Sequence, residues 1–266
     1  DAQNSLALMY LNGKGVPKDD AEAARWYLLT AELGNAYAQN LLGEMYHEGR
    51  GVPRDDAESL RWFRRAALQG NAEAQFNLGV KYDKGEGTEP DDAEALHWFL
   101  KAAEHGNTRA QLYLGIKYDK GEGVARDEVQ AVQWYRRAVE QGNATALENL
   151  MQIGFRGNAV AQCHLAEMYQ VGTGVVKDDT EAVKWFLKAA EQGHADAQFN
   201  LGVKYEMGEG VEQNDAEAVK WYRLAAEQGN VLAQCNLGVM YNAGRGVPKD
   251  DGEAVKWFLK AAEQDN

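Results

Sequence analysis

Hydrophobic positions recur along this chain with the spacing of a helix. Leu78, Gly79 and Tyr82 follow Ala74 at offsets of four, five and eight, which places all four on one helical face. A Gly-x-Gly segment at residues 85–87 then ends the apolar pattern. Glycine allows the positive φ found at a helix end and in a tight return. The pattern predicts a first helix that ends at this loop.

A second helix follows the loop. Asp91, with Glu94 three positions later, is typical of a helix N-terminus that carries a capping box. Each of the other full units has a corresponding pair, at Asp19/Glu22, Asp55/Glu58, Asp127/Gln130, Asp178/Glu181, Asn214/Glu217 and Asp250/Glu253. The second helix ends at a Gly-Asn pair such as Gly70-Asn71. We therefore expect each unit to be two antiparallel helices.

These helix pairs repeat every 36 residues, as one tryptophan per second helix shows. The tryptophans are Trp26, Trp62, Trp98 and Trp134 and, after a step of 51 residues, Trp185, Trp221 and Trp257. An Ala-Gln pair recurs in the same register of the first helices. The repeat predicts an all-α fold, an α/α solenoid of about seven 36-residue helix-pair repeats plus one lone helix.

The lone helix comes from an interruption of the repeat. After Gly142-Asn143 a first helix begins, but the chain reaches the next Ala161-Gln162 with 21 residues fewer than a full unit. We expect repeats 1–4 at residues 1–142, a truncated repeat at 143–160 and repeats 5–7 at 161–266, in one continuous solenoid domain. The interruption is interpreted either as a degenerate deletion absorbed by a local change of pitch, or as a joint that sets the curvature of a groove.

The repeated motif resembles a known family. Ala-x-Ala-Gln-x-x-Leu-Gly-x-x-Tyr, then Gly-x-Gly-Val and Asp-x-x-Glu-Ala-x-x-Trp-Tyr/Phe, is similar to the Sel-one-like repeat, a relative of the tetratricopeptide repeat. The resemblance implies a right-handed superhelix with a concave binding face. It also implies a bacterial scaffold or adaptor that binds a partner protein or peptide in its groove, in virulence or immunity. Some similar proteins are immunity proteins that neutralise a secreted toxic effector.

Charge narrows the class of partner. The 266 residues contain 28 Lys and Arg against 41 Asp and Glu, a net charge of −13. This charge disfavours binding to nucleic acid or to an anionic membrane surface. No apolar run reaches the roughly 20 residues of a membrane span. The chain starts inside a repeat unit without a visible leader, and the resemblance favours a periplasmic or secreted location over a cytoplasmic one.

Groups for catalysis are not concentrated anywhere in the sequence. The five histidines fall at five different repeat offsets, and no zinc, nucleophile-elbow or paired-cysteine motif occurs. Cys163 and Cys235 are two periods apart, too far for a disulfide between equivalent helices. Cysteine-rich relatives are associated with β-lactam binding or hydrolysis, but they resemble repeats with a cysteine pair in each unit, which this chain lacks. We expect no enzyme activity, catalytic residue, cofactor or metal.

Candidate binding residues form a stripe that varies along one face of the first helices. They lie at offsets three, seven and ten from the opening alanine of each first helix. The predicted stripe comprises Leu41, Met45, Glu48, Asn77, Lys81, Lys84, Tyr113, Lys117, Lys120, His164, Met168, Val171, Asn200, Lys204, Met207, Asn236, Met240 and Ala243. By analogy with tetratricopeptide grooves, this stripe is expected to line the concave surface.

Two parts of the stripe suggest specific chemistry. Lys81, Lys84, Lys117 and Lys120 form a basic island for an acidic segment of a partner, or else a solvated lysine face beside Asp83 and Asp119. Met168, Met207 and Met240, with Tyr113 and His164, form either an adaptable apolar contact or ordinary helix packing. Charge reversal at Lys81 and Lys117 is expected to weaken binding with little change in melting temperature. A monomer is the expected state.

Overall fold

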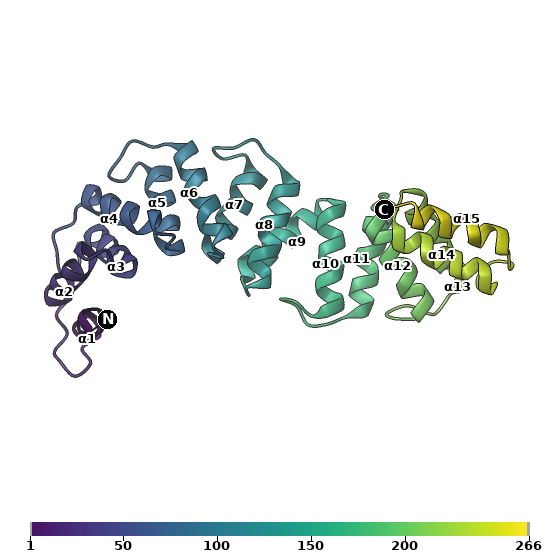
Figure 1. Cartoon of the computed structure of the whole chain (residues 1–266), viewed down its shortest axis with the longest axis horizontal. Coiled ribbons are helices and arrows are strands. Elements are labelled where there is room, and N and C mark those ends of the chain that lie inside the picture. Colours follow the sequence, from purple (N-terminus) through teal and green to yellow (C-terminus); the bar gives the residue numbers. More distant parts are fainter. Residues whose placement is uncertain (1, 265–266) are drawn as a thin grey trace. The chain divides into compact units, whose positions relative to one another are not determined.

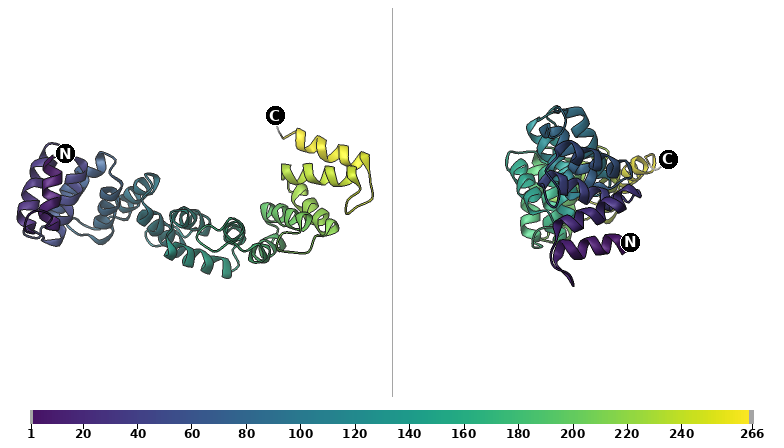
Figure 2. Two further views of the ribbon diagram at one scale, coloured as in Figure 1. Left: turned by 90° about the horizontal axis from the view of Figure 1, so that it is seen from below. Right: turned by 90° about the vertical axis from the view of Figure 1, so that its left-hand side faces the viewer.

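A computed structural model describes residues 2–264, in which fifteen α-helices and no strand are found (Figures 1 and 2). The chain forms two compact units, Asp1–Ala138 and Val139–Asn266. Within the described residues no helix is both long and apolar enough to cross a membrane. The predicted all-α fold of paired helices is confirmed.

Each unit is a succession of short helices joined by tight connections. The first contains α1 (Ala2–Asn12), α2 (Asp20–Glu32), α3 (Ala36–Glu48), α4 (Asp56–Leu68), α5 (Ala72–Lys84), α6 (Asp92–Glu104), α7 (Thr108–Lys120) and most of α8 (Glu128–Glu140). The second contains α9 (Ala144–Phe155), α10 (Ala159–Val171), α11 (Asp179–Glu191), α12 (Ala195–Met207), α13 (Asp215–Glu227), α14 (Val231–Ala243) and α15 (Asp251–Ala262).

Helices pack in chain order, and small residues set how closely they approach. In the first unit α3 packs on α4 and α4 on α5. Gly79 of α5 faces the ring of Phe99 in α6, where an added Cβ would lie 2.7 Å from the ring. Trp62 packs with the alanines of α2 in the preceding pair. The aromatic pair after each second-helix N-cap therefore joins its own first helix and the previous pair, which is how a solenoid builds a continuous core.

Side chains at the helix N-termini confirm the predicted caps, with one correction. The Asp91 side chain accepts hydrogen bonds from the backbone N–H groups of Ala93 and Glu94, both at 3.0 Å. The reciprocal half of the predicted capping box is absent there. The N–H of Asp91 donates to the carbonyl of Tyr82 at 3.0 Å, and the Glu94 carboxylate accepts from the indole of Trp98 at 3.0 Å. The last turn of α5 therefore supplies the acceptor that the glutamate was expected to provide.

The recurring glutamine of the first helices has a structural role. The buried side chain of Gln75 donates to the carbonyl of Ala67 at the end of the preceding helix, at 3.1 Å. Gln198 makes the same bond to Ala190 at 3.0 Å. A helix C-terminus leaves carbonyl groups without intrahelical partners, and a buried one needs a donor. The Ala-Gln pair thus recurs because it joins consecutive helices.

The lone helix α9 combines both helix types. It begins like a first helix, since Asn143 caps it by accepting from the N–H of Ala146 at 2.8 Å. It ends like a second helix, because the N–H of Asn158 donates to Ile153, as that of Asn71 donates to Ala66. Gln162 of the next helix donates to the carbonyl of Gly154 at 2.9 Å, as the glutamines of α3, α5, α7, α12 and α14 do to the preceding second helix. The single helix α9 therefore has the N-terminus of a first helix and the C-terminus of a second helix. That the chain is one continuous domain with a joint here stays a prediction.

One cap predicts a pH effect. His194 stands where the other first helices of the second unit have asparagine, and its ring nitrogen accepts from the N–H of Ala197 at 3.3 Å. Burial lowers the pKa of His194 below its usual 6.5. The folded state then binds this proton less readily than the unfolded state, so stability falls as pH drops below about 6.5.

We expect the free energy of unfolding of His194→Asn, measured by urea titration, to exceed that of the wild type by about 1 kcal/mol at pH 5. At pH 8 the two free energies should be equal. Asn230→His, at the equivalent cap of α14, is the matched control and should acquire the same loss at pH 5. An equal effect of His194→Asn at both pH values would show that the proton is not involved.

Candidate partner-binding face

The structure divides the predicted stripe by offset. All residues at offset seven are buried, whereas those at offsets three and ten are partly or fully exposed. The buried set is Met45, Lys81, Lys117, Met168, Lys204 and Met240. The exposed or partly exposed set is Leu41, Asn77, Lys84, Tyr113, Lys120, His164, Asn200, Met207 and Asn236, with Glu48, Val171 and Ala243. Six of the predicted contact residues thus present little or no side-chain surface to a partner.

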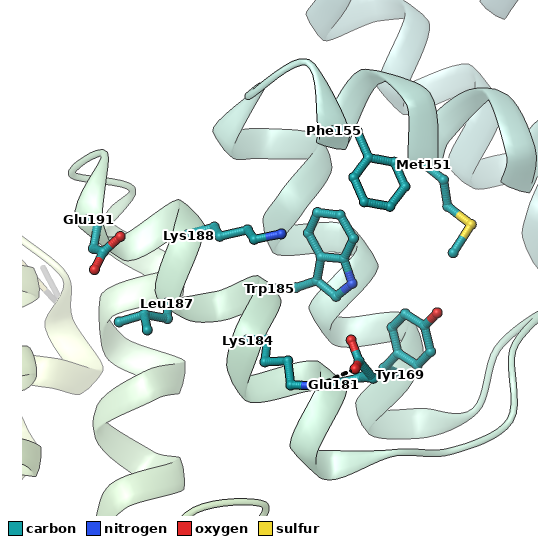
Figure 3. A pocket seen from close by; sticks show the side chains of 9 residues that line it. All are labelled: Met151, Phe155, Tyr169, Glu181, Lys184, Trp185, Leu187, Lys188 and Glu191. Carbon is teal, nitrogen blue, oxygen red and sulfur yellow. Dashed lines mark hydrogen bonds and ion pairs between the residues drawn. The ribbon is translucent and has the colours of Figure 1, made fainter.

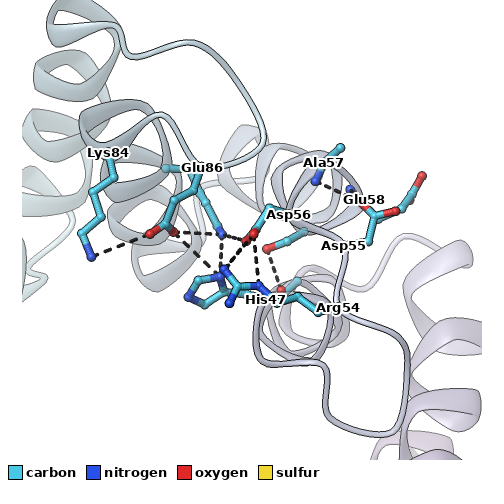
Figure 4. Close-up of polar contacts among 11 residues, drawn as sticks. His47, Arg54, Asp55, Asp56, Ala57, Glu58, Lys84 and Glu86 are labelled. Carbon is cyan, nitrogen blue, oxygen red and sulfur yellow. Dashed lines mark hydrogen bonds and ion pairs between the residues drawn. The ribbon is translucent and has the colours of Figure 1, made fainter.

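Burial at offset seven follows from a contact between consecutive helix pairs. The ammonium group of Lys81, in α5, donates to Asp56 at the start of α4 at 2.5 Å and to Glu86 in its own Gly-x-Gly loop at 3.2 Å. The ring nitrogen Nδ1 of His47, in α3, lies 2.7 Å from the same ammonium nitrogen. Figure 4 shows His47, Asp56 and Glu86 converging from these three elements. The lysine therefore links two helix pairs.

The electrostatics of this cluster are balanced internally. Burial alone would raise the pKa of Asp56, but hydrogen bonds from Lys81, His47 and Arg54 hold it well below its usual range. His47, Asp56 and Glu86 could also offer ligand atoms to a metal ion, since these atoms lie within 4.8 Å of one another. The Lys81 ammonium already lies within hydrogen-bond distance of all three residues. The arrangement is therefore that of an ion-pair network around a buried cation.

The second unit repeats the network with one instructive exchange. Lys204 donates to Asp179 at 2.7 Å and to Glu209 at 2.8 Å, at the same spacings as Lys81 with Asp56 and Glu86. In the next helix pair offset seven is Met240, and the loop residue that corresponds to Glu209 is Arg245. Arg245 now pairs with Asp215, at 2.8 Å, and with Glu206, at 2.9 Å. One cation meets the helix-start aspartate in either case, supplied by the helix or by the loop.

The predicted basic island is accordingly wrong in part. Lys81 and Lys117 are buried, and Lys117 is ion-paired with Asp83. Only Lys84 and Lys120 expose their side chains, at 57% and 61%, and each has a glutamate within 4 Å. The alternative of a solvated lysine face does not describe Lys117 either, because its ammonium group is buried and ion-paired with Asp83. The expected small change in melting temperature on reversing Lys81 and Lys117 is replaced by a large destabilisation, since a buried cation would become an anion among carboxylates.

A polar groove remains on the face of α3, α5 and α7. It encloses about 420 Å³. Its lining residues are Glu44, His47, Glu48, Phe63, Asn77, Val80, Lys81, Lys84, Glu86, Arg109 and Tyr113. The predicted residues Asn77, Lys84 and Tyr113 therefore meet in one groove. Glu44, Glu86 and Arg109 were not predicted, because they lie outside the three offsets considered.

Hydrogen bonds fix the side chains of this groove. Asn77 donates to Asn40 at 3.2 Å and to Glu44 at 3.4 Å, and Asn40 donates to Glu44 at 2.9 Å. Burial raises the pKa of Glu44 above its usual value. Arg109 pairs with Glu73 at 2.5 Å and lies over the ring of Phe76, 4.2 Å from its centroid. These contacts hold polar groups in place, which reduces the ordering cost of binding.

Tyr113 is the aromatic residue of the groove that faces solvent. It is 37% exposed, and its ring packs on Phe76 with centroids 5.3 Å apart. Tyrosine combines a rigid apolar ring with a hydroxyl group and is enriched at protein interfaces. Asn77 and Tyr113 both stand at offset three of their helices. The groove can therefore offer a row of polar and aromatic contacts to an extended backbone.

In the second unit the residues at offset three are His164, Asn200 and Asn236. His164 contacts Glu167 at 2.9 Å, and Asn200 makes no side-chain hydrogen bond among residues 2–264. The expected apolar stretch is largely helix packing, since Met168 and Met240 are buried whereas Met207 is 63% exposed. What remains available for a partner is again at offsets three and ten.

The cysteines bear on the question of catalysis. Cys163 is buried and Cys235 is partly buried, and both thiols are free. Burial raises the pKa of Cys163 to about 12, which keeps it a thiol at neutral pH. A thiol of this kind is a poor nucleophile, because the thiolate is the reactive form. Cys163 therefore behaves as a small apolar core residue.

Comparison with known proteins agrees with this architecture. The sequence profile of the Sel1 repeat matches residues 1–35, 36–71, 72–107, 108–143, 159–194, 195–230 and 231–266. The segment between residues 143 and 159, which contains α9, lies outside these matches. Comparison with curated proteins gave no match.

Three solved structures of bacterial proteins are similar to this chain. A protective antigen of uropathogenic Escherichia coli strains with an SLR fold is 38% identical over the whole chain, with a TM-score of 0.53. The chain spans 62% of that protein's length. A Sel1 repeat protein from Oxalobacter formigenes is 37% identical, with 100% of this chain and 72% of that one covered and a TM-score of 0.45. An immunity protein from Pseudomonas aeruginosa is 19% identical, with 86% of this chain and 82% of that one covered and a TM-score of 0.36.

Proposed function

The chain belongs to the Sel1 repeat family, and we propose that it is a bacterial scaffold that binds an extended segment of another protein along the first-helix face. Sel1 repeat proteins generally mediate protein–protein interactions. The observation that supports this placement is the polar groove of α3, α5 and α7, where Asn77, Lys84 and Tyr113 lie together on one face. Contacts come from offsets three and ten, because offset seven is buried.

The chemistry of the groove fits a peptide better than a small metabolite. Its lining is mainly polar, with paired charges and one exposed aromatic ring. Asparagine side chains can donate to a backbone carbonyl and accept from a backbone N–H at once. In the second unit Asn200 and Asn236 stand at the same offset as Asn77. Within the second unit, a partner segment in extended conformation would meet two such groups one repeat apart.

We keep the proposal that the partner segment is acidic, but only two of the four predicted lysines are exposed to contact it. Lys84 and Lys120 are the exposed lysines of the predicted island, and each is only weakly held by a glutamate on the surface. Exposed ion pairs of this kind contribute little and exchange partners readily. Neutralisation of a secreted toxic effector is a special case of the same function, and no contact on this face favours it over another protein partner.

Site-specific photo-cross-linking tests the proposal. A photoreactive phenylalanine analogue placed at Tyr113 and, in a second protein, at Asn200 should cross-link the same partner from a bacterial lysate. The matched control places it at Leu68, which is 71% exposed at the end of a second helix. Cross-linking of equal yield from Leu68 would contradict a binding site on the first-helix face.

Substitution then measures the contribution of the face. We expect Tyr113→Ala to weaken binding of the identified partner about tenfold, which corresponds to roughly 1.4 kcal/mol for an exposed interface aromatic residue. The melting temperature should change little, since the ring is partly exposed. Isothermal titration calorimetry with Leu68→Ala as the control distinguishes this loss from a general surface effect.

A further inference from the structure

A second pocket lies where the repeat is interrupted. It encloses about 370 Å³ between the end of α9 and one face of α11. Met151 and Phe155 of α9 and Trp185 of α11 form its apolar part, with Tyr169 and Lys188 at its edge (Figure 3). These residues come from the second unit and are separate from the polar groove of α3, α5 and α7.

The pocket exists because α9 carries apolar residues where other helices do not. Met151 stands at offset five, which is glycine in most first helices because their own second helix packs an aromatic ring there. The lone helix has no second helix of its own, so a long side chain fits. Phe155 stands where most second helices end in glutamate, such as Glu104 and Glu191. Its side chain is nevertheless 69% exposed.

An exposed phenylalanine at a position that is acidic in most other repeats indicates an apolar surface that a partner can bury. The rings of Phe155 and Trp185 lie 5.1 Å apart at 60°, so they form one continuous apolar wall. Trp185 is only 4% exposed, and its indole N–H has no acceptor among residues 2–264. A cavity of this size holds one large side chain, and such aromatic pockets supply most of the energy of a protein interface.

The charge at the edge of the pocket indicates what lies next to that side chain. The Lys188 ammonium is 4.2 Å from the centroid of Trp185 and 5.8 Å from that of Phe155. Within the described residues it has no carboxylate partner, although this chain has a net charge of −13. The neighbouring Lys184, in contrast, pairs with Glu181 at 2.5 Å. Lys188 is thus a cation available for a carboxylate from outside.

We propose that this pocket binds one bulky apolar side chain of a partner protein, with an adjacent carboxylate of the same segment bound by Lys188. The inference rests on the proposed function only in that the occupant is part of a protein. It uses different helices and a different chemistry from the first-helix face. The partner would therefore contact the scaffold at two sites, one polar and one apolar.

Short peptides test the pocket without knowledge of the partner. The probes are acetyl-Phe-Glu-amide and acetyl-Glu-Phe-amide, compared with their glutamine counterparts. Binding is followed by the seven tryptophan indole N–H signals in ¹H–¹⁵N NMR spectra, with Trp185 assigned from Trp185→Phe. We expect the Trp185 signal to shift on millimolar addition, the other six to stay, and the glutamate peptides to bind about fivefold tighter than the glutamine peptides.

Two substitutions make the result specific. Phe155→Glu restores the residue usual at this position, so the fold should persist while the Trp185 shift is lost. Lys188→Gln should remove the preference for glutamate and keep weak binding of phenylalanine. Equal shifts of all seven indoles, or an unchanged titration of Phe155→Glu, would overturn the proposal. The peptide titration does not use the partner found by cross-linking. Its result is therefore independent of the test of the first-helix face, and either proposal can fail without the other.

Discussion

Replacing Gly210 by alanine should destabilise the protein by about 3 kcal/mol or more. The substitution removes no interaction, so the whole loss would come from the steric clash of the added methyl group. Gly210 is the second glycine of a Gly-x-Gly loop, with φ at 72°. A Cβ built on it would lie 2.1 Å from the carbonyl oxygen of Asp179, at the start of α11. Backbone cannot retreat from such a contact as a flexible side chain can, so the loop between α12 and α13 must move away from α11.

Gly193 provides the matched control for backbone conformation. It also has a positive φ, at 87°, but no atom lies within 4 Å of an added Cβ. Gly193→Ala should therefore cost only the strain of a left-handed residue, about 1 kcal/mol. Urea unfolding followed by circular dichroism and tryptophan fluorescence measures both. If the two variants lose the same stability, the glycine is needed for the turn alone and not for the close approach.

This pair of glycines shows what the sequence could predict about the fold. The recurrence of Gly-x-Gly after each first helix was enough to place a tight return there, because φ is a local property. The contact of Gly210 with Asp179 joins residues of consecutive helix pairs, and the spacing of small residues does not reveal it. The same holds for Gln75, whose hydrogen bond to Ala67 explains why an Ala-Gln pair recurs.

The candidate site was less accessible to sequence reasoning. The offset rule selected Asn77 and Tyr113, which line the polar groove, but it also selected Lys81, because a helical face is wider than its exposed part. A lysine on such a face is expected to be solvated, and only its partners on two other elements reveal that it is buried. One signal was present in the sequence. Lysine at offset seven accompanies glutamate in the loop, as in Lys204 with Glu209, whereas Met240 accompanies Arg245.

The position of the lone helix was predictable from the sequence, but the pocket beside it was not. Its existence followed from 21 missing residues, and α9 was found where they predicted it. The sequence could not show that the helix ends as a second helix, because this depends on the hydrogen bonds of Gly154 and Asn158. Without that alignment Phe155 is an ordinary apolar residue. With it, Phe155 is an aromatic side chain at a position that elsewhere carries a charge.

The exchange between Lys204 and Arg245 leads to the second large effect. Lys204→Met should destabilise the protein by about 2 kcal/mol, because it leaves Asp179 and Glu209 without their buried cation. The expected loss lies below the roughly 3–5 kcal/mol of a fully buried pair, since the Asp179 side chain is 28% exposed and water can solvate it in part. Lys120→Met, at an exposed lysine with a weak partner, is the control and should change stability by less than about 0.5 kcal/mol.

The double variant Lys204→Met with Glu209→Arg separates the ion pair from general packing. It reproduces the contact of Arg245 with the helix-start aspartate in the neighbouring helix pair, but Gln170 stands where Glu206 provides a second carboxylate, so it should recover part of the lost stability. The hydrogen bond from Lys204 lowers the pKa of Asp179, so its contribution is present above the unfolded pKa of about 3.9 and is lost as pH falls through the folded value. The difference between wild type and Lys204→Met should therefore shrink below about pH 4. Urea titrations at pH 7 and pH 3 measure both effects, and a double variant no more stable than Lys204→Met would contradict the equivalence of helix and loop as sources of the cation.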